Sequence, residues 1–239
     1  MEMEITMKKC ALHSLGCKVN SYETQAMQKM MESAGYEIVP FGEEIADIYI
    51  INTCSVTNIA DRKSRQMIHK AKKLNPEAVV AAAGCYVESA GDNIDEDVDI
   101  VIGNNEKSHL IEILNEYFEH MDKEKSVDIG KATDFDELNI DSPLEHTRAY
   151  VKIQDGCNRF CSYCIIPYVR GRIRSRKPDD VMAEIKRVAA SGCKEVVLTG
   201  IHLSSYGLDF KDSTVKLIDV IEAVNRIEGI ERIRLGSLE

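Results

Sequence analysis

The 239-residue sequence has no long apolar run and no excess of positive charge. None of its apolar stretches approaches the roughly 18 residues that span a membrane. Its first residues, MEMEITMKKC, are acidic and lack the apolar core of a secretory signal. These absences predict a cytoplasmic protein that stays outside the membrane. The formal net charge of −10 argues against broad, non-specific binding to nucleic acid, although it is compatible with a local basic patch.

Cysteine, in contrast, is plentiful, with eight residues in the chain. In a reducing compartment, several cysteines indicate metal or redox chemistry more often than disulfide bonds. The chain is long enough for one large domain or two ordinary ones, and its hydrophobic content of 44% is that of a globular protein. The position of each cysteine relative to the predicted strands therefore decides how it is interpreted.

The first 122 residues alternate short apolar strands with amphipathic helices. Asn20 is a plausible N-cap of the first helix, with Glu23 completing a capping box and Gly35 ending it. Repeated strand–helix units of this length predict an α/β domain with a flavodoxin-like, doubly wound parallel sheet. The predicted strands cover 10–15, 36–39, 47–53, 78–84 and 98–103, and the helices cover 20–35, 60–74 and 106–121.

The periodicity fades over 123–145, where Asp and Glu dominate and Pro143 lies near the end. This composition predicts an acidic, solvated linker. Strand–helix units resume in a second domain over 146–239, with strands at 148–154, 195–200 and 232–237 and helices at 179–192 and 214–229. Because three strands and two helices cannot close a barrel, we expect the sequence to be the N-terminal portion of a longer protein.

The strongest local motif is DGCNRFCSYC, in which Cys157, Cys161 and Cys164 are spaced C-x3-C-x2-C after a predicted strand. Three close thiolates suit an iron–sulfur cluster or zinc. A structural zinc site usually takes four protein ligands, and no fourth cysteine or histidine follows nearby. The spacing therefore favours a cluster with three cysteine ligands and one open iron.

Cys17, Cys54 and Cys85 each follow a predicted strand of the first domain. The carboxyl ends of parallel strands share one edge of a sheet, so these thiols are expected to converge there on a second cluster. The alternative is three small buried residues, because free cysteine is often buried. Cys10 and Cys193 lie at the opposite ends of their strands, which indicates a structural role.

The segments LGCKVNSYET, INTCSVT and AAGCY, followed by the C-x3-C-x2-C motif and VRGRIRSR, resemble the methylthiotransferases of the radical S-adenosylmethionine (SAM) superfamily. The resemblance covers nearly the whole chain and implies that the second domain begins a radical SAM partial (β/α) barrel. The LGCKVN form is most similar to the branch that acts on N6-threonylcarbamoyladenosine next to the tRNA anticodon. Sister branches modify isopentenyl-adenosine in tRNA or an aspartate of a ribosomal protein.

The resemblance implies roles for both cysteine sets. Cys157, Cys161 and Cys164 would hold the [4Fe–4S] cluster that binds SAM and cleaves it reductively, with electrons from a donor such as flavodoxin or ferredoxin. The resulting radical would abstract hydrogen from carbon 2 of the adenine. An auxiliary [4Fe–4S] cluster would supply the sulfur, and a second SAM would supply the methyl group. The ligands of the auxiliary cluster would be Cys17, Cys54 and Cys85, and the SAM contacts would be Tyr163, Thr199 and Gly200.

Two basic segments stand out in this acidic chain. Arg170, Arg172, Arg174 and Arg176 have no acid among them and are candidates for contact with phosphates of the tRNA anticodon arm, or for positioning SAM or substrate. The alternative is a solvated charged loop. The basic helix over 60–74 is interpreted instead as an exposed face.

Two other functions stay open at this point. One is a protein methylthiotransferase that modifies a ribosomal aspartate, and the other is a non-enzymatic, zinc- or thiol-containing interaction scaffold. The family continues beyond these two domains into the rest of the barrel and an RNA-binding domain. The chain by itself is therefore expected to hold the auxiliary cluster and to be inactive in turnover.

Overall fold

The computed structural model describes residues 8–120, 129, 132–141, 148–211 and 214–238. These residues form two compact units. The first contains 8–16 and 27–120, and the second contains 17–26 and the described residues from 129 onward. Much of the predicted linker, including Pro143, lies outside the described residues.

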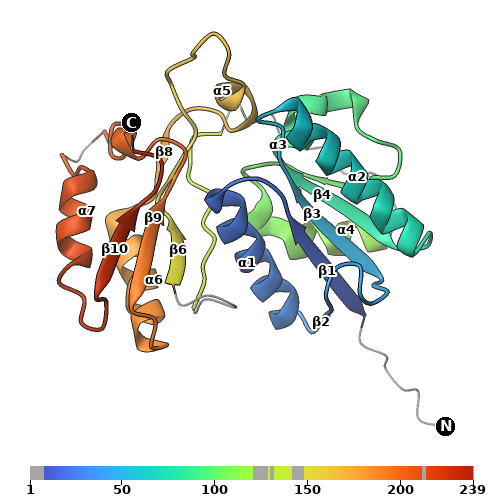
Figure 1. Ribbon diagram of the computed structural model, residues 1–239, viewed down its shortest axis with the longest axis horizontal. Helices are drawn as coiled ribbons and strands as arrows, with labels where there is room; N and C mark the ends of the chain where they lie inside the picture. Colours follow the sequence, from blue (N-terminus) through green and yellow to red (C-terminus); the bar gives the residue numbers. More distant parts are fainter. Residues whose placement is uncertain (1–7, 121–128, 130–131, 142–147, 212–213, 239) are drawn as a thin grey trace. The chain divides into compact units, whose positions relative to one another are not determined.

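The first unit is built on a five-stranded sheet with the order β2-β1-β3-β4-β5 (Figure 1). All four strand pairs are parallel. This is the flavodoxin-like order, which confirms the predicted fold class. The strands are β1 (Lys9–Ser14), β2 (Glu37–Ile38), β3 (Ile48–Thr53), β4 (Val79–Gly84) and β5 (Ile100–Ile102).

Helices cover both faces of this sheet, and successive residues of β3 point to opposite faces. Tyr49 and Ile51 pack in the same cluster as Ile68 of α2. Ile48 and Ile50 pack on the other side with residues of α1 and α4. The continuous apolar sequence of β3 follows from burial on both faces. The helices are α1 (Lys18–Ser33), α2 (Asn58–Leu74), α3 (Cys85–Ala90) and α4 (Leu110–His120), with 3₁₀ turns η1 (Gly91–Asn93) and η2 (Lys107–His109).

The second unit contains a parallel, three-stranded sheet with the order β10-β9-β6 and a separate antiparallel pair, β7–β8. The sheet is open, and the described residues form no closed barrel. Its strands are β6 (Arg148–Lys152), β7 (Gln154–Asp155), β8 (Arg174–Ser175), β9 (Glu195–Thr199) and β10 (Arg232–Leu235). Its helices are α5 (Ile166–Val169), α6 (Pro178–Ala190) and α7 (Leu217–Val224), with the 3₁₀ turn η4 (Leu203–Ser205).

Helix α1 differs from the prediction at its start. It begins at Lys18, so Asn20 lies inside the first turn and is buried rather than capping the helix. Its end agrees with the prediction, because Gly35 follows the helix with φ +87°, a conformation that glycine adopts readily. The sequence signals also missed the short helix α3 and the β7–β8 pair, which are too brief to show periodicity.

The described part of the predicted linker is only partly solvated, because its acids and polar residues are mostly exposed while its apolar residues are buried or partly buried. Leu138 and Ile140 are each 2% exposed. The hydroxyl of Tyr22 donates a hydrogen bond to the Leu138 carbonyl, and the Ile140 amide donates to Glu184 at 2.9 Å. Apolar residues placed between the acids therefore anchor this segment to the second unit.

None of the helices in the described part of the chain is long and apolar enough to cross a membrane.

Candidate functional site

The C-x3-C-x2-C loop follows β7 and is fixed to the segment that precedes β8. The Cys157 amide donates to the Gly171 carbonyl at 3.1 Å, and the Ile173 amide donates to Asn158 Oδ1 at 3.1 Å. Within the loop, the Cys164 amide donates to the Cys161 carbonyl at 2.9 Å. These bonds give a short loop a defined shape without using any sulfur atom.

An aromatic cluster supports the same loop. Phe160 has φ 48°, an uncommon conformation for a non-glycine residue. Its ring packs edge-on against Tyr168 with centroids 5.6 Å apart, and the Arg172 guanidinium lies 4.3 Å from its centroid. These contacts offset the backbone strain and hold the loop in place.

The three thiols of the loop are chemically suited to a cluster. All are free; Cys161 is exposed, and Cys157 and Cys164 are partly exposed. Accessible cysteines on a shaped loop fit the three-thiolate donor set of a [4Fe–4S] cluster. Their role as ligands remains a prediction.

Gln154 ties this loop to the end of β9, and sequence reasoning missed it. Its Nε2 donates to the Asp155 and Gly156 carbonyls, each at 2.7 Å. Its Oε1 accepts from the Ile201 and His202 amides at 3.0 and 2.7 Å. The signal available in the sequence was a glutamine at the end of a predicted strand. A side-chain amide that is buried there needs partners for all its polar groups, so it ties neighbouring segments together.

The three predicted SAM contacts differ in their surroundings. Thr199 is buried at the end of β9. A Cβ on Gly200 would lie 2.9 Å from Gln154 Oε1, so glycine permits the close approach described above. Tyr163, by contrast, is 91% exposed. Contact with SAM remains a prediction for all three residues.

Cys54 and Cys85 follow neighbouring strands of the first unit, whose last residues Thr53 and Gly84 are paired. Both cysteines are buried, at 6% and 3% exposed. The Cys54 amide donates to Ser64 Oγ at 3.1 Å. A Cβ on Gly84 would lie 2.7 Å from the Thr53 carbonyl oxygen. Glycine is therefore required where β4 turns into α3.

A polar side chain reaches the sulfur of Cys85. Asn104 Nδ2 lies 3.8 Å from Cys85 Sγ, within the distance of a hydrogen bond to sulfur. Asn104 follows β5, the strand next to β4, and is fully buried. Contacts of this kind orient a cysteine that ligates a metal.

Cys17 belongs to the second unit, with residues 17–26. Its side chain is exposed, and its Sγ lies 3.9 Å from Asn20 Oδ1. In the sequence, it comes three residues after Ser14, the end of β1, which pairs with Asn52 of β3. A shared site for Cys17, Cys54 and Cys85 remains a prediction.

The two remaining cysteines have the surroundings expected of structural residues. Cys10 is fully buried in the sheet, and burial raises the pKa of its thiol to about 12. Cys193 is 8% exposed. A thiol with so high a pKa as that of Cys10 is a poor nucleophile and metal ligand.

Most of the arginine-rich segment is buried, which disfavours the predicted phosphate contact for three of its members. Arg170 and Arg174 are 1% exposed, and Arg176 is 0% exposed. Arg176 forms ion pairs with Glu184 and Glu137. Guanidinium groups enclosed in this way present no donors to an external phosphate. The prediction remains only for Arg172, which is exposed.

Arg170 also has a defined effect on a neighbouring acid. Burial alone would raise the pKa of Asp155, but Arg170 and then Lys152 lower it well below the usual range. Asp155 is therefore a charged group inside the protein, two residues before Cys157.

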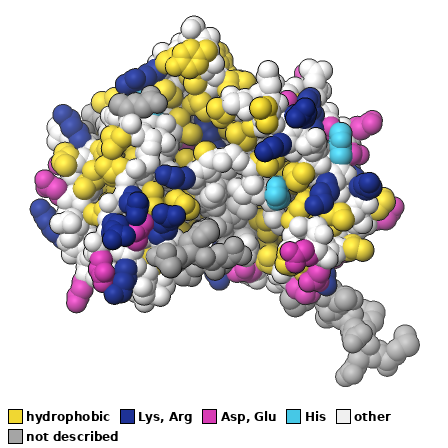
Figure 2. Space-filling model, in the orientation of Figure 1, with side chains coloured by type: hydrophobic (Ala, Val, Ile, Leu, Met, Phe, Trp, Pro, Cys, Tyr) yellow, Lys and Arg dark blue, Asp and Glu magenta, His cyan; other side chains and the backbone are white. Residues whose placement is uncertain are grey.

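The basic residues of α2 lie on an exposed face, as predicted, and basic side chains are visible there on the right of Figure 2. Lys72 is the exception, because it is half-buried and lies 2.7 Å from Asp99. The exposed basic residues are Arg62, Lys63, Arg65, Lys70 and Lys73.

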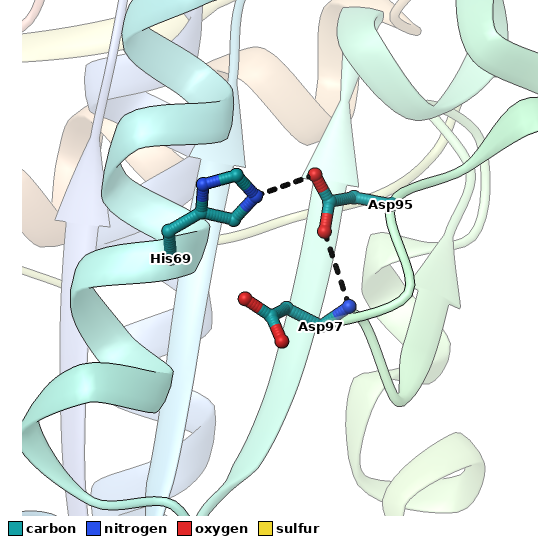
Figure 3. A group of neighbouring side chains, drawn as sticks. All are labelled: His69, Asp95 and Asp97. Atoms are coloured by element: carbon teal, nitrogen blue, oxygen red, sulfur yellow. Dashed lines mark hydrogen bonds and ion pairs between the residues drawn. The ribbon is translucent and has the colours of Figure 1, made fainter.

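Among the described residues, the potential metal-ligating atoms of one group, His69, Asp95 and Asp97, all lie within 4.8 Å of one another (Figure 3). His69 Nε2 lies 2.7 Å from Asp95 Oδ2, and Asp95 Oδ1 accepts from the Asp97 amide at 3.1 Å. His69 is exposed. A surface hydrogen bond beside a turn accounts for this arrangement, and we assign it no metal.

Comparison with known proteins matches each unit to a family. Residues 9–103 match "Uncharacterized protein family UPF0004", and residues 151–236 match the radical SAM superfamily. The threonylcarbamoyladenosine tRNA methylthiotransferase MtaB of Bacillus subtilis is 43% identical over 98% of this chain and 52% of its own length. The MtaB of Aquifex aeolicus is 43% identical over 96% of this chain and 56% of its own length.

The chain is similar over nearly its whole length to methylthiotransferases, and residues 151–236 match the radical SAM superfamily. It spans about half the length of the curated relatives it matches. A relative from another branch, the tRNA-2-methylthio-N(6)-dimethylallyladenosine synthase of Moorella thermoacetica, is 36% identical over 92% of this chain and 50% of its own length.

Solved structures support the fold of this chain. The radical SAM methyltransferase TsrM from Kitasatospora setae, solved with cobalamin and a [4Fe–4S] cluster, aligns with a TM-score of 0.58 at 12% identity, covering 97% of this chain and 61% of TsrM. The cobalamin-dependent radical SAM enzyme OxsB aligns with a TM-score of 0.58 at 10% identity, covering 96% of this chain and 38% of OxsB. At these identities, the similarity concerns the fold alone.

Proposed function

We propose that this chain is part of an enzyme that inserts a methylthio group at carbon 2 of N6-threonylcarbamoyladenosine in tRNA. The observation that carries the proposal is the similarity, at 34–43% identity over almost the whole chain, to four relatives with that named activity. The two cysteine sets, whose members follow strands in the sequence, support the same chemistry.

In this proposal Cys157, Cys161 and Cys164 hold the [4Fe–4S] cluster that supplies the electron for SAM cleavage. The chain's own residues shape and restrain the loop that carries these ligands. Gln154 joins it to the end of β9, where Thr199 and Gly200 are the proposed SAM contacts. Cys17, Cys54 and Cys85 are the proposed ligands of a second [4Fe–4S] cluster, the source of sulfur. An aromatic C–H bond is beyond acid–base side chains, so the cofactors must perform the difficult step.

The proposed macromolecular substrate is the anticodon arm of tRNA, which places the enzyme in the cytoplasm. Arg172 and the exposed basic face of α2 supply local positive charge in a chain of net charge −10. Backbone phosphates are bound by such groups. The proposed electron donor is a flavodoxin or ferredoxin.

Nucleoside mass spectrometry of tRNA tests the substrate. A strain that lacks the gene should lose the methylthio group from threonylcarbamoyladenosine, and the full-length gene should restore it. A full-length Cys157→Ala variant should not. Unchanged methylthio-threonylcarbamoyladenosine in the deletion strain would overturn the assignment.

The similarity to dimethylallyladenosine synthases, at 34–36% identity, makes that tRNA nucleoside the second candidate. The same measurement separates the two, because each methylthio nucleoside has its own mass. Loss of a methylthio group from a ribosomal-protein aspartate, with both nucleosides unchanged, would instead support the protein substrate.

A further inference from the structure

The first turns of α1 are buried in the second unit. Residues 17–26 group with that unit, and Asn20 and Glu23 are 1% and 0% exposed. Because the helix begins at Lys18, the Asn20 side chain is not needed as a cap, and its amide oxygen can serve another contact.

Glu23 is part of a network of buried charges with Lys152, Asp155 and Arg170. Lys152 Nζ lies 2.8 Å from Glu23 Oε1 and 2.6 Å from Asp155 Oδ2. Arg170 Nη1 lies 3.1 Å from Glu23 Oε1 and 3.0 Å from Asp155 Oδ2. None of these four side chains is more than 2% exposed, and Arg174 lies at the margin, 4.0 Å from Asp155. Within the four, two positive charges face two negative ones. Separating buried charges from their partners is costly, so the network fixes the segments that carry them.

Arg170 is the point at which two cysteine-bearing segments meet. Its Nη2 donates to Asn20 Oδ1 at 2.7 Å, and the same oxygen lies 3.9 Å from Cys17 Sγ. Its Nη1 donates to Asp155, which lies two residues before Cys157. One guanidinium therefore contacts the segment of Cys17 and the segment of Cys157 at the same time.

The chemistry of arginine suits this position. A guanidinium is planar and carries donors on two terminal nitrogens in a fixed geometry, so it can bond to groups on different sides at once. The ammonium of lysine is a compact charge, and at this position it could neutralise a carboxylate without reaching Asn20. A lysine at position 170 would thus keep the positive charge but lose the contact with Asn20.

We propose that Arg170 is a positioning residue that holds Cys17, through Asn20, in a fixed place relative to the loop of Cys157. The proposal rests on the proposed function, in which Cys17 is a ligand of the auxiliary cluster. A ligand already held in place loses less conformational entropy when a cluster binds. Without the link, the start of α1 loosens and the auxiliary cluster is lost, while the three ligands of the radical SAM loop remain.

The test compares Asn20→Ala and Arg170→Lys with Arg176→Lys, all in the full chain. Arg176 is an equally buried arginine of the same segment that contacts neither Asn20 nor Asp155. Each protein is reconstituted anaerobically, and iron, EPR signal and thermal stability are measured. We expect iron to fall from about eight to about four per chain in Asn20→Ala and Arg170→Lys, at four irons per cluster. Arg176→Lys should keep about eight despite a similar loss of stability. Retention of about eight irons in the first two variants would overturn the proposal.

A second measurement does not depend on clusters. In the cluster-free full chain, mass spectrometry gives the rate at which iodoacetamide alkylates Cys17, with the exposed Cys161 as internal control. Asn20→Ala and Arg170→Lys should raise the Cys17 rate about fivefold, as loss of one hydrogen bond would, and leave the Cys161 rate unchanged. Equal Cys17 rates would refute the positioning role. If the unaltered chain binds only one cluster, the proposed auxiliary site fails, and this measurement alone decides the role of Arg170.

Discussion

Gly156 shows how narrowly one position can be constrained by its surroundings. It has φ +68°, and an added Cβ would lie 1.9 Å from the Arg172 carbonyl oxygen. Both the conformation and the space exclude any other residue. The glycine thereby allows the loop of Cys157 to lie directly against the neighbouring segment.

Gly156→Ala should lower the free energy of unfolding by about 3 kcal/mol or more, because a backbone clash adds to left-handed strain. Gly192→Ala is the matched control: its φ is +91°, but an added Cβ meets nothing within 4 Å. That variant should lose only about 1 kcal/mol, from strain alone. Urea unfolding of the three proteins measures both values, and equal losses would contradict the importance of the close approach to Arg172.

Cys17 is the residue on which the two-cluster prediction is most sharply tested. Cys17→Ala should remove the auxiliary cluster and leave the radical SAM cluster in place. The reconstituted full-length enzyme should then still cleave SAM but insert no sulfur into tRNA. Iron analysis with a SAM-cleavage assay checks this, and Cys10→Ala, at a buried structural cysteine, is the control. Unchanged iron in Cys17→Ala would show that Cys17 is not a ligand.

At the scale of elements, α2 combines a buried stripe with an exposed basic face. Lys63 and Lys73 lie on that face. If the face binds tRNA phosphates, Lys63→Gln and Lys73→Gln should weaken binding to every tRNA sequence. Each substitution should also reduce the salt dependence, lowering the slope of log K against log salt by about 1, because one lysine–phosphate ion pair no longer forms.

Lys186→Gln, at an exposed position on α6, is the control for these α2 variants and should leave tRNA binding unchanged. Filter binding or fluorescence anisotropy over a salt series measures the slope. An unchanged slope in the α2 variants would show that this face does not bind tRNA and is only a solvated surface.

Elements with clear periodicity were predicted well, and short elements were not. The apolar runs of β3 and β4 and the amphipathic pattern of α2 follow from burial of whole faces, which leaves a mark in the sequence. α3 and the β7–β8 pair are held by particular contacts, such as the bonds of Gln154 around the cysteine loop. Such contacts leave no periodic pattern. The segment over 132–141 was predicted as solvated because its acids outnumber the apolar residues that anchor it.

At the scale of the whole molecule, metal content distinguishes the methylthiotransferase functions from the non-enzymatic interaction scaffold. Anaerobic purification and reconstitution should yield about eight irons and eight inorganic sulfides per chain, in two clusters. About four of each would support the radical SAM cluster alone. Zinc without iron would refute both clusters and favour the interaction scaffold. Cys157→Ala, with one radical SAM ligand removed, is the control that assigns half of the iron.

The sequence by itself determined the flavodoxin-like order of the first unit, the open parallel sheet of the second and the placement of six cysteines after strands. These features follow from local patterns, because the pattern of apolar and polar residues along a short segment indicates which strands are buried and where loops begin. Only the tertiary structure decided which charges are solvated. Arg170 and Asn20 are 150 residues apart in the chain yet are bonded to each other and buried. A run of arginines looks the same in a sequence whether it faces water or acids, and its environment is set by partners that only the folded chain supplies.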